Sequence, residues 1–178
     1  MNADRNRRSG ERGYNLIEVI VAMAILASVL LSILTLFIFG RRNVYSGKQL
    51  TMANSVATRV AEDLVPLNRD TFYSAFGITN STTLTSPTIG GIDYADVAVV
   101  STADTTVDPQ AYLTNWGNLV TEANFAQGKV SLIIEPTMFA SGSTFTTADI
   151  VKIRIVVEWR EGGRSRSVVL DTVKIDRS

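Results

Sequence analysis

The most apolar part of the chain runs from Val19 to Phe39 and contains no charged residue. Its only polar side chains are three Ser and Thr hydroxyls. A helix of about 20 predominantly apolar residues is long enough to cross the hydrocarbon core of a membrane. The pattern therefore predicts a transmembrane helix over residues 14–40.

The residues that follow continue a helical pattern with one apolar side. Small and aliphatic residues recur there at spacings of three and four: Ala53, Val56, Ala57, Val60, Ala61 and Leu64. This spacing is typical of an amphipathic helix that covers a core. Pro66 ends the pattern, because proline disfavours helix in the residue before it. We expect one helix from about Tyr14 to Val65, on the order of 75 Å long at 1.5 Å per residue, with an amphipathic half over residues 41–66.

The last third of the chain has the alternating pattern of strands. Residues 129–135 and 150–160 are rich in Val and Ile, and the second run alternates. Its expected inward residues are Ile153, Ile155, Val157 and Trp159, with charged residues mostly on the other, wet face and Val156 as the exception. Glu161-Gly162-Gly163-Arg164 has the composition of a tight turn. Residues 165–175 then return, and their expected inward residues are Val168, Leu170 and Val173.

These patterns together indicate an α+β fold. The long N-terminal helix should pack the apolar stripe of its outer half on a small antiparallel sheet of about four strands. The globular head would comprise residues 67–178 and end in a β-hairpin. A short apolar run, Val97–Val100, is the expected additional strand.

The remainder of residues 67–128 carries weaker patterns, and the segments Thr79–Thr88 and Gly90-Gly91 are expected to be loops. Four carboxylates around the Val97–Val100 run could supply oxygen ligands for calcium: Asp93, Asp96, Asp104 and Asp108. They lack the spacing of a calcium-binding loop, so solvated carboxylates are the favoured interpretation and no metal is assigned. Asn80-Ser81-Thr82 fits a glycosylation triplet, which matters only in a suitable host.

The composition offers no catalytic chemistry. The chain has no cysteine and no histidine, which excludes disulfides and thiol catalysis and removes the commonest general base. The motifs of a nucleophile elbow and of a phosphate-binding glycine loop are also missing. We expect a protein that is not an enzyme and that needs no cofactor.

The charge balance does not favour nucleic acid as a partner. The chain has 17 Lys or Arg and 17 Asp or Glu, so it has no net basic field. Arg160, Arg164 and Arg166 gather at the expected hairpin turn. A solvated turn explains them more simply than a contact with DNA.

A polar junction precedes the apolar stretch. Residues 1–13 form a short basic leader that ends in Gly13; Tyr14 follows, and Glu18 is a lone carboxylate at the start of the apolar helix. A carboxylate costs roughly 2.5–3.5 kcal/mol at the middle of a membrane and less near its edge. An ordinary signal anchor does not explain these spacings. A secretory signal cut at Ala22-Met23-Ala24 would leave an apolar run exposed.

The segment Gly13-Tyr14-Asn15-Leu16-Ile17-Glu18-Val19 resembles the N-terminal signal of type IV pilins and of the pseudopilins of type II secretion. The resemblance implies that a prepilin peptidase cuts between Gly13 and Tyr14 and methylates the new amine. It also implies that Glu18, fifth after the cut, pairs with the N-terminal amine of a neighbouring subunit. Tyr14 replaces the usual phenylalanine, and no proline stands near Thr35, where major pilins commonly have one.

The C-terminal order Val-Glu-Trp, Gly-Gly-Arg, Ser-Val-Val-Leu-Asp-Thr is similar to the last hairpin of minor pilins and minor pseudopilins. The resemblance implies a minor pilin-like structural subunit, held by one helix in the inner membrane with its head in the periplasm, and later assembled into a type IV pilus. The implied partners are the prepilin peptidase, other pilin subunits, the inner-membrane assembly platform and membrane lipid. A minor pseudopilin, a competence pilin and a membrane-anchored sensor or binding module remain alternatives.

Overall fold

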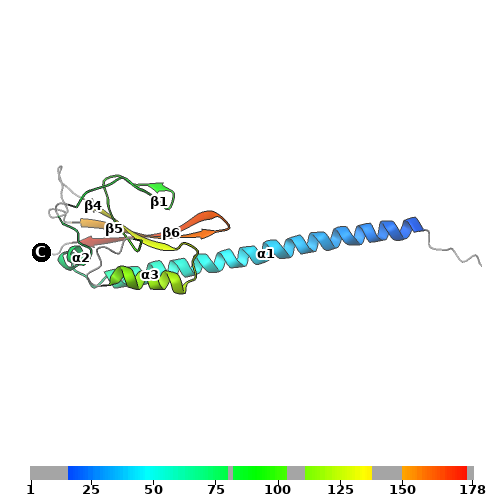
Figure 1. Ribbon diagram of the computed structural model, residues 1–178, viewed down its shortest axis with the longest axis horizontal. Coiled ribbons are helices and arrows are strands. Elements are labelled where there is room, and N and C mark those ends of the chain that lie inside the picture. Colours follow the sequence, from blue (N-terminus) through cyan, green and yellow to red (C-terminus); the bar gives the residue numbers. More distant parts are fainter. Residues whose placement is uncertain (1–15, 80–81, 104–110, 138–149, 176–178) are drawn as a thin grey trace, which may run out of the picture. The chain divides into compact units, whose positions relative to one another are not determined.

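The computed structural model describes residues 16–79, 82–103, 111–137 and 150–175. The chain divides into two compact units, residues 1–44 and residues 45–178. The first unit, as far as it is described, is the apolar half of helix α1 (Leu16–Leu64), and the second contains the rest of α1 and all other elements (Figure 1). Several residues singled out in the sequence lie outside the described residues: Gly13, Tyr14, Asn80, Ser81, Asp104 and Asp108.

Helix α1 agrees with the long helix expected from the sequence. Within the described residues it runs from Leu16 to Leu64, so that it ends two residues before Pro66. The side chain of Lys174, from the last strand, donates to the carbonyls of Val65 and Leu67 just past this end. These contacts give a hydrogen-bond donor to two main-chain carbonyls just beyond the last helical residue. Burial there lowers the pKa of Lys174.

Four strands form an antiparallel sheet in the order β3-β4-β5-β6. They are β3 (Ala98–Ser101), β4 (Lys129–Thr137), β5 (Ile150–Glu161) and β6 (Arg164–Ile175). The α+β class and the four strands are as expected, and each strand boundary lies within two residues of its predicted place. Gly162 and Gly163 make the turn between β5 and β6 with φ values of +56° and +82°, which glycine adopts without steric cost.

One face of this sheet packs on the second half of α1. The four predicted inward residues of β5 are all 3% exposed or less: Ile153, Ile155, Val157 and Trp159. They share one core with the stripe residues of α1: Ala53, Val56, Ala57, Val60 and Leu64. Ala61 is partly buried against the same core. The stripe is therefore a packing surface of the head, as predicted.

The opposite face of the sheet is partly covered, which corrects the expectation of a wet face. A small hairpin, β1 (Thr88–Ile89) and β2 (Ile92–Asp93), belongs to the covering segment. A second cluster lies beneath it: Ile89, Tyr94, Val97, Ile133 and Val156. Burial in this cluster explains why Val156 is the one apolar residue among the charged positions of β5.

Glu158 shows the same correction for a charged side chain. It was expected in water, but it is only 9% exposed. One carboxylate oxygen accepts a hydrogen bond from the Gly90 main-chain N–H at 2.9 Å, and the other lies 2.9 Å from the Lys129 ammonium. The covering segment therefore supplies one partner of this buried charge, Gly90, and β4 supplies the other, Lys129, as a buried carboxylate requires.

The expected inward position of Val173 is wrong. Val173 is paired with Lys152 and is 53% exposed. Val168 and Leu170, by contrast, pack against the main core. Side chains alternate between the two faces of a strand, so residues 168 and 170 share one face and residue 173 must lie on the other.

Residues 67–128 hold two short helices that the sequence pattern did not predict. They are α2 (Arg69–Ala75) and α3 (Tyr112–Glu122). Helix α2 begins after Asn68, whose side-chain oxygen accepts a hydrogen bond from the Thr71 N–H at 2.7 Å. Helix α3 lies beside the second half of α1 (Figure 1), where the indole N–H of buried Trp116 donates to Asp63 at 3.0 Å.

A buried polar contact fixes the register of α1 on the sheet. Gln49 is 7% exposed, although it lies on the apolar side of α1. Its side-chain oxygen accepts a hydrogen bond from the Trp159 indole N–H at 3.1 Å, and its amide nitrogen donates to the Tyr45 hydroxyl at 3.1 Å. Because a polar group inside a core is costly without its partner, sliding α1 along the sheet would break this contact at a penalty.

We predict that a fragment beginning at Arg41 is a soluble monomer, because it keeps the buried stripe of α1. A fragment beginning at Leu67 should aggregate, because the inner face of the sheet then becomes a large exposed apolar patch. Size-exclusion chromatography with light scattering distinguishes the two. A stable monomer from the shorter fragment would contradict the packing of α1 on the sheet.

We further predict that Gln49→Leu destabilises the longer fragment by about 1–3 kcal/mol, because it leaves the Trp159 N–H buried without an acceptor. Asn54→Leu makes the same kind of change at an exposed position of α1 and should stay within about 0.5 kcal/mol of the parent. Urea unfolding measures both. Equal stabilities for the two variants would show that the Gln49 contact does not hold the helix in register.

Candidate functional site

The apolar half of α1 packs against nothing in the described part of the chain. All residues from 16 to 45 are exposed, and the large apolar side chains of residues 16–39 range from 42% exposed at Val19 to 76% at Leu16. The helix is long and apolar enough to cross a membrane. An exposed apolar surface of this extent requires lipid or another protein as its partner.

The hydroxyl groups of this half are satisfied by the helix itself. Ser28 donates to the carbonyl of Ile25 at 2.7 Å, and Ser32 donates to the carbonyl of Ser28 at 2.9 Å. Thr35 donates to the carbonyl of Leu31 at 2.8 Å. Such bonds to the preceding turn let a hydroxyl enter an apolar environment without losing its hydrogen bond. The three hydroxyls therefore need no external partner.

Glu18 differs from these hydroxyls. It is the only charged residue between residues 16 and 39, and its carboxylate forms no hydrogen bond or ion pair with any described residue. It lies in the first turn of α1, where the helix dipole favours an anion by about 0.3–1 kcal/mol. The cost of a carboxylate in a membrane reaches roughly 2.5–3.5 kcal/mol at the centre and is smaller at the edge. The dipole thus offsets part of the cost, and an external cation would offset the rest.

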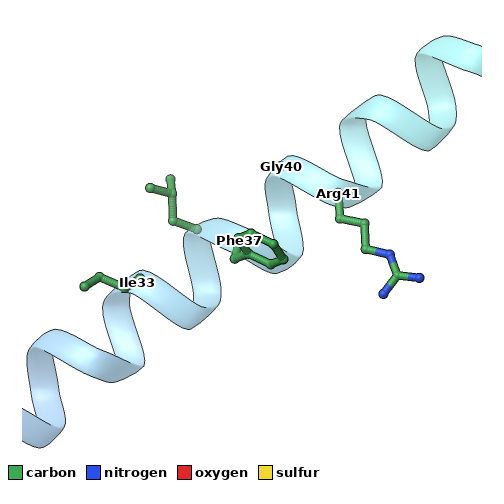
Figure 2. A pocket seen from close by; sticks show the side chains of 5 residues that line it. Ile33, Phe37, Gly40 and Arg41 are labelled. Carbon is green, nitrogen blue, oxygen red and sulfur yellow. The ribbon is translucent and has the colours of Figure 1, made fainter.

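The surface hollows on this half are shallow grooves made by α1 alone. One is lined by Ile33, Leu36, Phe37, Gly40 and Arg41, and Figure 2 shows these side chains projecting from a single helix. Another is lined by Glu18, Val19, Ala22, Met23 and Leu26. A third is lined by Leu31, Ser32, Thr35, Leu36 and Phe39. One helix cannot enclose a substrate, but such grooves accept side chains of another helix or acyl chains of lipid.

The candidate calcium residues do not form a metal site in the described part of the chain. No group of three or more His, Cys, Asp or Glu there could hold a metal ion. Asp93 is exposed and accepts a hydrogen bond from the Thr88 hydroxyl at 2.6 Å, and Asp96 is exposed as well. Asp93 and Asp96 are thus both solvated, although Asp93 lies in β2 and not in a loop.

The arginines of the hairpin turn lie at the surface, as expected. Arg160 and Arg164 are exposed, and Arg166 is 3.4 Å from the Glu161 carboxylate. Glu161 also accepts a hydrogen bond from the Ser46 hydroxyl of α1 at 3.1 Å. This contact between the turn and the helix has no signal in the sequence pattern, because both residues are polar and 115 positions apart.

The structure thus places one of the predicted site residues, Glu18, on an exposed apolar helix, whereas Gly13 and Tyr14 lie outside the described residues. No protein-family model matches the chain, and no curated protein or solved structure matches it either. A function must therefore follow from the chemistry of the helix and of the head themselves.

Proposed function

We propose that the chain is a minor pilin-like structural subunit. It would be made as a precursor, anchored in the inner membrane by α1, processed by a prepilin peptidase between Gly13 and Tyr14, and assembled into a type IV pilus. The observation that supports this most is Glu18, the one charged group in an exposed apolar helix half whose hydroxyls are all satisfied internally.

The two halves of α1 suit such a subunit. The second half is committed to the head, because its stripe is buried in the main core. The first half is exposed along its length. Lipid tails and other apolar helices are both apolar surroundings, so an apolar helix surface is stable in either. The same surface would therefore serve as membrane anchor and as filament core.

Glu18 would give assembly its direction and register. In the low dielectric of a helical core, its carboxylate would pair with the N-terminal amine of a neighbouring subunit. Removing one member of a buried ion pair is strongly destabilising, by about 3–5 kcal/mol, because the other charge stays buried without a partner. A subunit entering out of register would meet the same penalty.

Of the alternatives, only the membrane-anchored sensor or binding module predicts a different N-terminus, because a competence pilin would be processed in the same way. A minor pseudopilin of type II secretion would share the processing and the Glu18 pair, so it differs only in the machine that assembles it. A membrane-anchored sensor or binding module would keep its leader and would have no use for Glu18. The mature N-terminus therefore separates the filament proposals from the sensor.

We predict that protein from its native host begins at Tyr14 and carries a methylated amine. Intact-mass analysis measures both features in one spectrum. Replacing Gly13 with leucine should leave the leader in place, because the resemblance places the cut directly after a glycine. A mature chain that starts at Met1 or after Ala24 would rule out the pilin assignment.

We predict that Glu18→Gln and Glu18→Leu leave processing and membrane insertion intact but prevent incorporation into filaments. Glutamine keeps the size and hydrogen bonding of glutamate but not its charge, so it should fail like leucine. The measurement is the amount of subunit in sheared filaments relative to the inner membrane.

Ser32→Ala is the matched control for Glu18, because it removes a polar group of the same helix half that already has an internal partner. It should incorporate normally. If both Glu18 variants also incorporated at the parent level, the pairing mechanism would be wrong, although processing at Gly13 could still be correct.

A further inference from the structure

Four basic residues lie at the same end of the second unit, because Ser46 and Gln49, on either side of Lys48 in the sequence, contact the β5–β6 hairpin. Arg160, Arg164 and Arg166 belong to the turn of the β5–β6 hairpin, and Lys48 belongs to α1; all four are exposed. We call these four residues the basic tip. The one carboxylate among them is Glu161, which is bound to Arg166 and to the Ser46 hydroxyl. The basic tip therefore carries a net positive charge.

Two hydrogen bonds hold the β5–β6 hairpin against α1 at a defined position along the helix. Glu161 contacts Ser46, and Trp159 contacts Gln49 one turn further along the helix. Figure 1 shows the turn between β5 and β6 beside α1. Because these contacts lie within the second unit, they fix Arg160 and Arg164 close to residues 46–49 of the chain.

The chain length then limits how far the basic tip can lie from a membrane. Ser46 is seven residues beyond Phe39, the last residue of the apolar stretch. Seven residues span about 10 Å as a helix and at most about 25 Å fully extended. The limit applies at any angle between the two units, so a membrane-inserted α1 keeps the basic tip near the bilayer surface.

The rest of the second unit has the opposite charge. Residues 45–178 contain 11 Lys or Arg and 14 Asp or Glu. Among the described residues of this unit, the balance outside the basic tip and Glu161 is 6 basic to 9 acidic residues. The head is thus electrically polarised, and its positive end is the end that the chain ties to the apolar segment. A polarised head would orient in the field of an anionic surface.

We propose that the basic tip binds the headgroups of anionic phospholipids in the membrane that anchors α1, and so docks the head on the bilayer surface. Arginine suits this role, because its guanidinium donates paired hydrogen bonds to phosphate oxygens. Each basic residue near an anionic membrane strengthens binding by about fivefold, and the effect decays within a Debye length. The proposal needs the membrane insertion of α1 but neither cleavage at Gly13 nor filament assembly.

Anionic lipid fits the basic tip better than a nucleic acid does. Affinity for a duplex grows with the number of phosphates that a protein neutralises, which favours an extended basic surface. Here the positive charge is confined to one small end, and the remainder of the head would repel a polyanion. A lipid surface contacts only the end of the head that faces it, so the acidic remainder does not oppose its binding.

The test uses the full chain in nanodiscs of anionic phosphatidylglycerol or of zwitterionic phosphatidylcholine. Amide hydrogen exchange of residues 160–166 should be several-fold slower in the anionic discs, and added salt should remove the difference. Arg160→Ser combined with Arg164→Ser should also remove it, because neither arginine has an ion pair in the described part of the chain. Arg166 is left in place to keep its contact with Glu161.

The matched control is Arg59→Ser combined with Lys152→Ser, which deletes the same charge away from the basic tip. Its residues 160–166 should exchange like those of the parent.

Equal exchange in the two lipids, or equal protection in the tip variant and the control, would overturn the proposal. So would protection that requires added DNA, or protection that rises with the number of chains per disc in both lipids, since these outcomes indicate nucleic acid or a second copy. The uncut chain, made with Gly13→Leu, should behave like the cut one, so that the result is independent of the pilin assignment.

Discussion

The packing of the α1 stripe on the four-stranded sheet is the contact on which the rest of the structure depends. Five stripe residues are at most 7% exposed, and burying a valine or leucine side chain fully is worth about 1.5–3 kcal/mol. Strand β5 brings Ile153, Ile155 and Val157 to the same core. The sheet therefore depends on the helix as a second layer, in the way that an apolar sheet face must be covered. Because α1 is committed to the head along one half only, its other half is left with an apolar surface that the described chain does not cover.

The elements that the sequence predicted correctly are the long ones and the four-residue strand β3, whose run of Val and Ala stands out between polar segments. A stripe repeated over several turns of α1, and an alternation repeated along β5, each provide many consistent positions, so chance matches are few. Short elements lack that redundancy. Helix α2 has only 7 residues, and the one local signal for it was Asn68, an N-cap residue that polar loops also contain. The two-residue strands β1 and β2 have no period to detect, and with them the cover over Val156 and Glu158 was missed.

The features of the candidate site also fall into those that the sequence pattern predicts and those that only the structure shows. Glu18 stands out in the sequence because a charge inside an apolar stretch has few structural reasons to be there. That the three hydroxyls of the same stretch are satisfied by their own helix follows only from the geometry, because it depends on side-chain rotamers rather than on spacing. The contacts of Gln49 and Glu161 were not predictable either. Each joins α1 to β5 across more than 100 residues, and a pattern along the chain carries no information about such pairs.

The two proposed charge contacts act at opposite ends of the apolar stretch, and they differ in how they respond to solvent. Headgroup contacts of the basic tip lie at a wet surface, where salt screens them within about 10 Å at 0.1 M ionic strength. A Glu18 pair inside a core of helices is shielded from ions and depends on desolvation and geometry instead. A subunit that left the membrane for a filament would lose the first contact and gain the second. The anchored state would then weaken as ionic strength rises while the assembled state would not, so the balance between them shifts toward assembly without any change in the head itself.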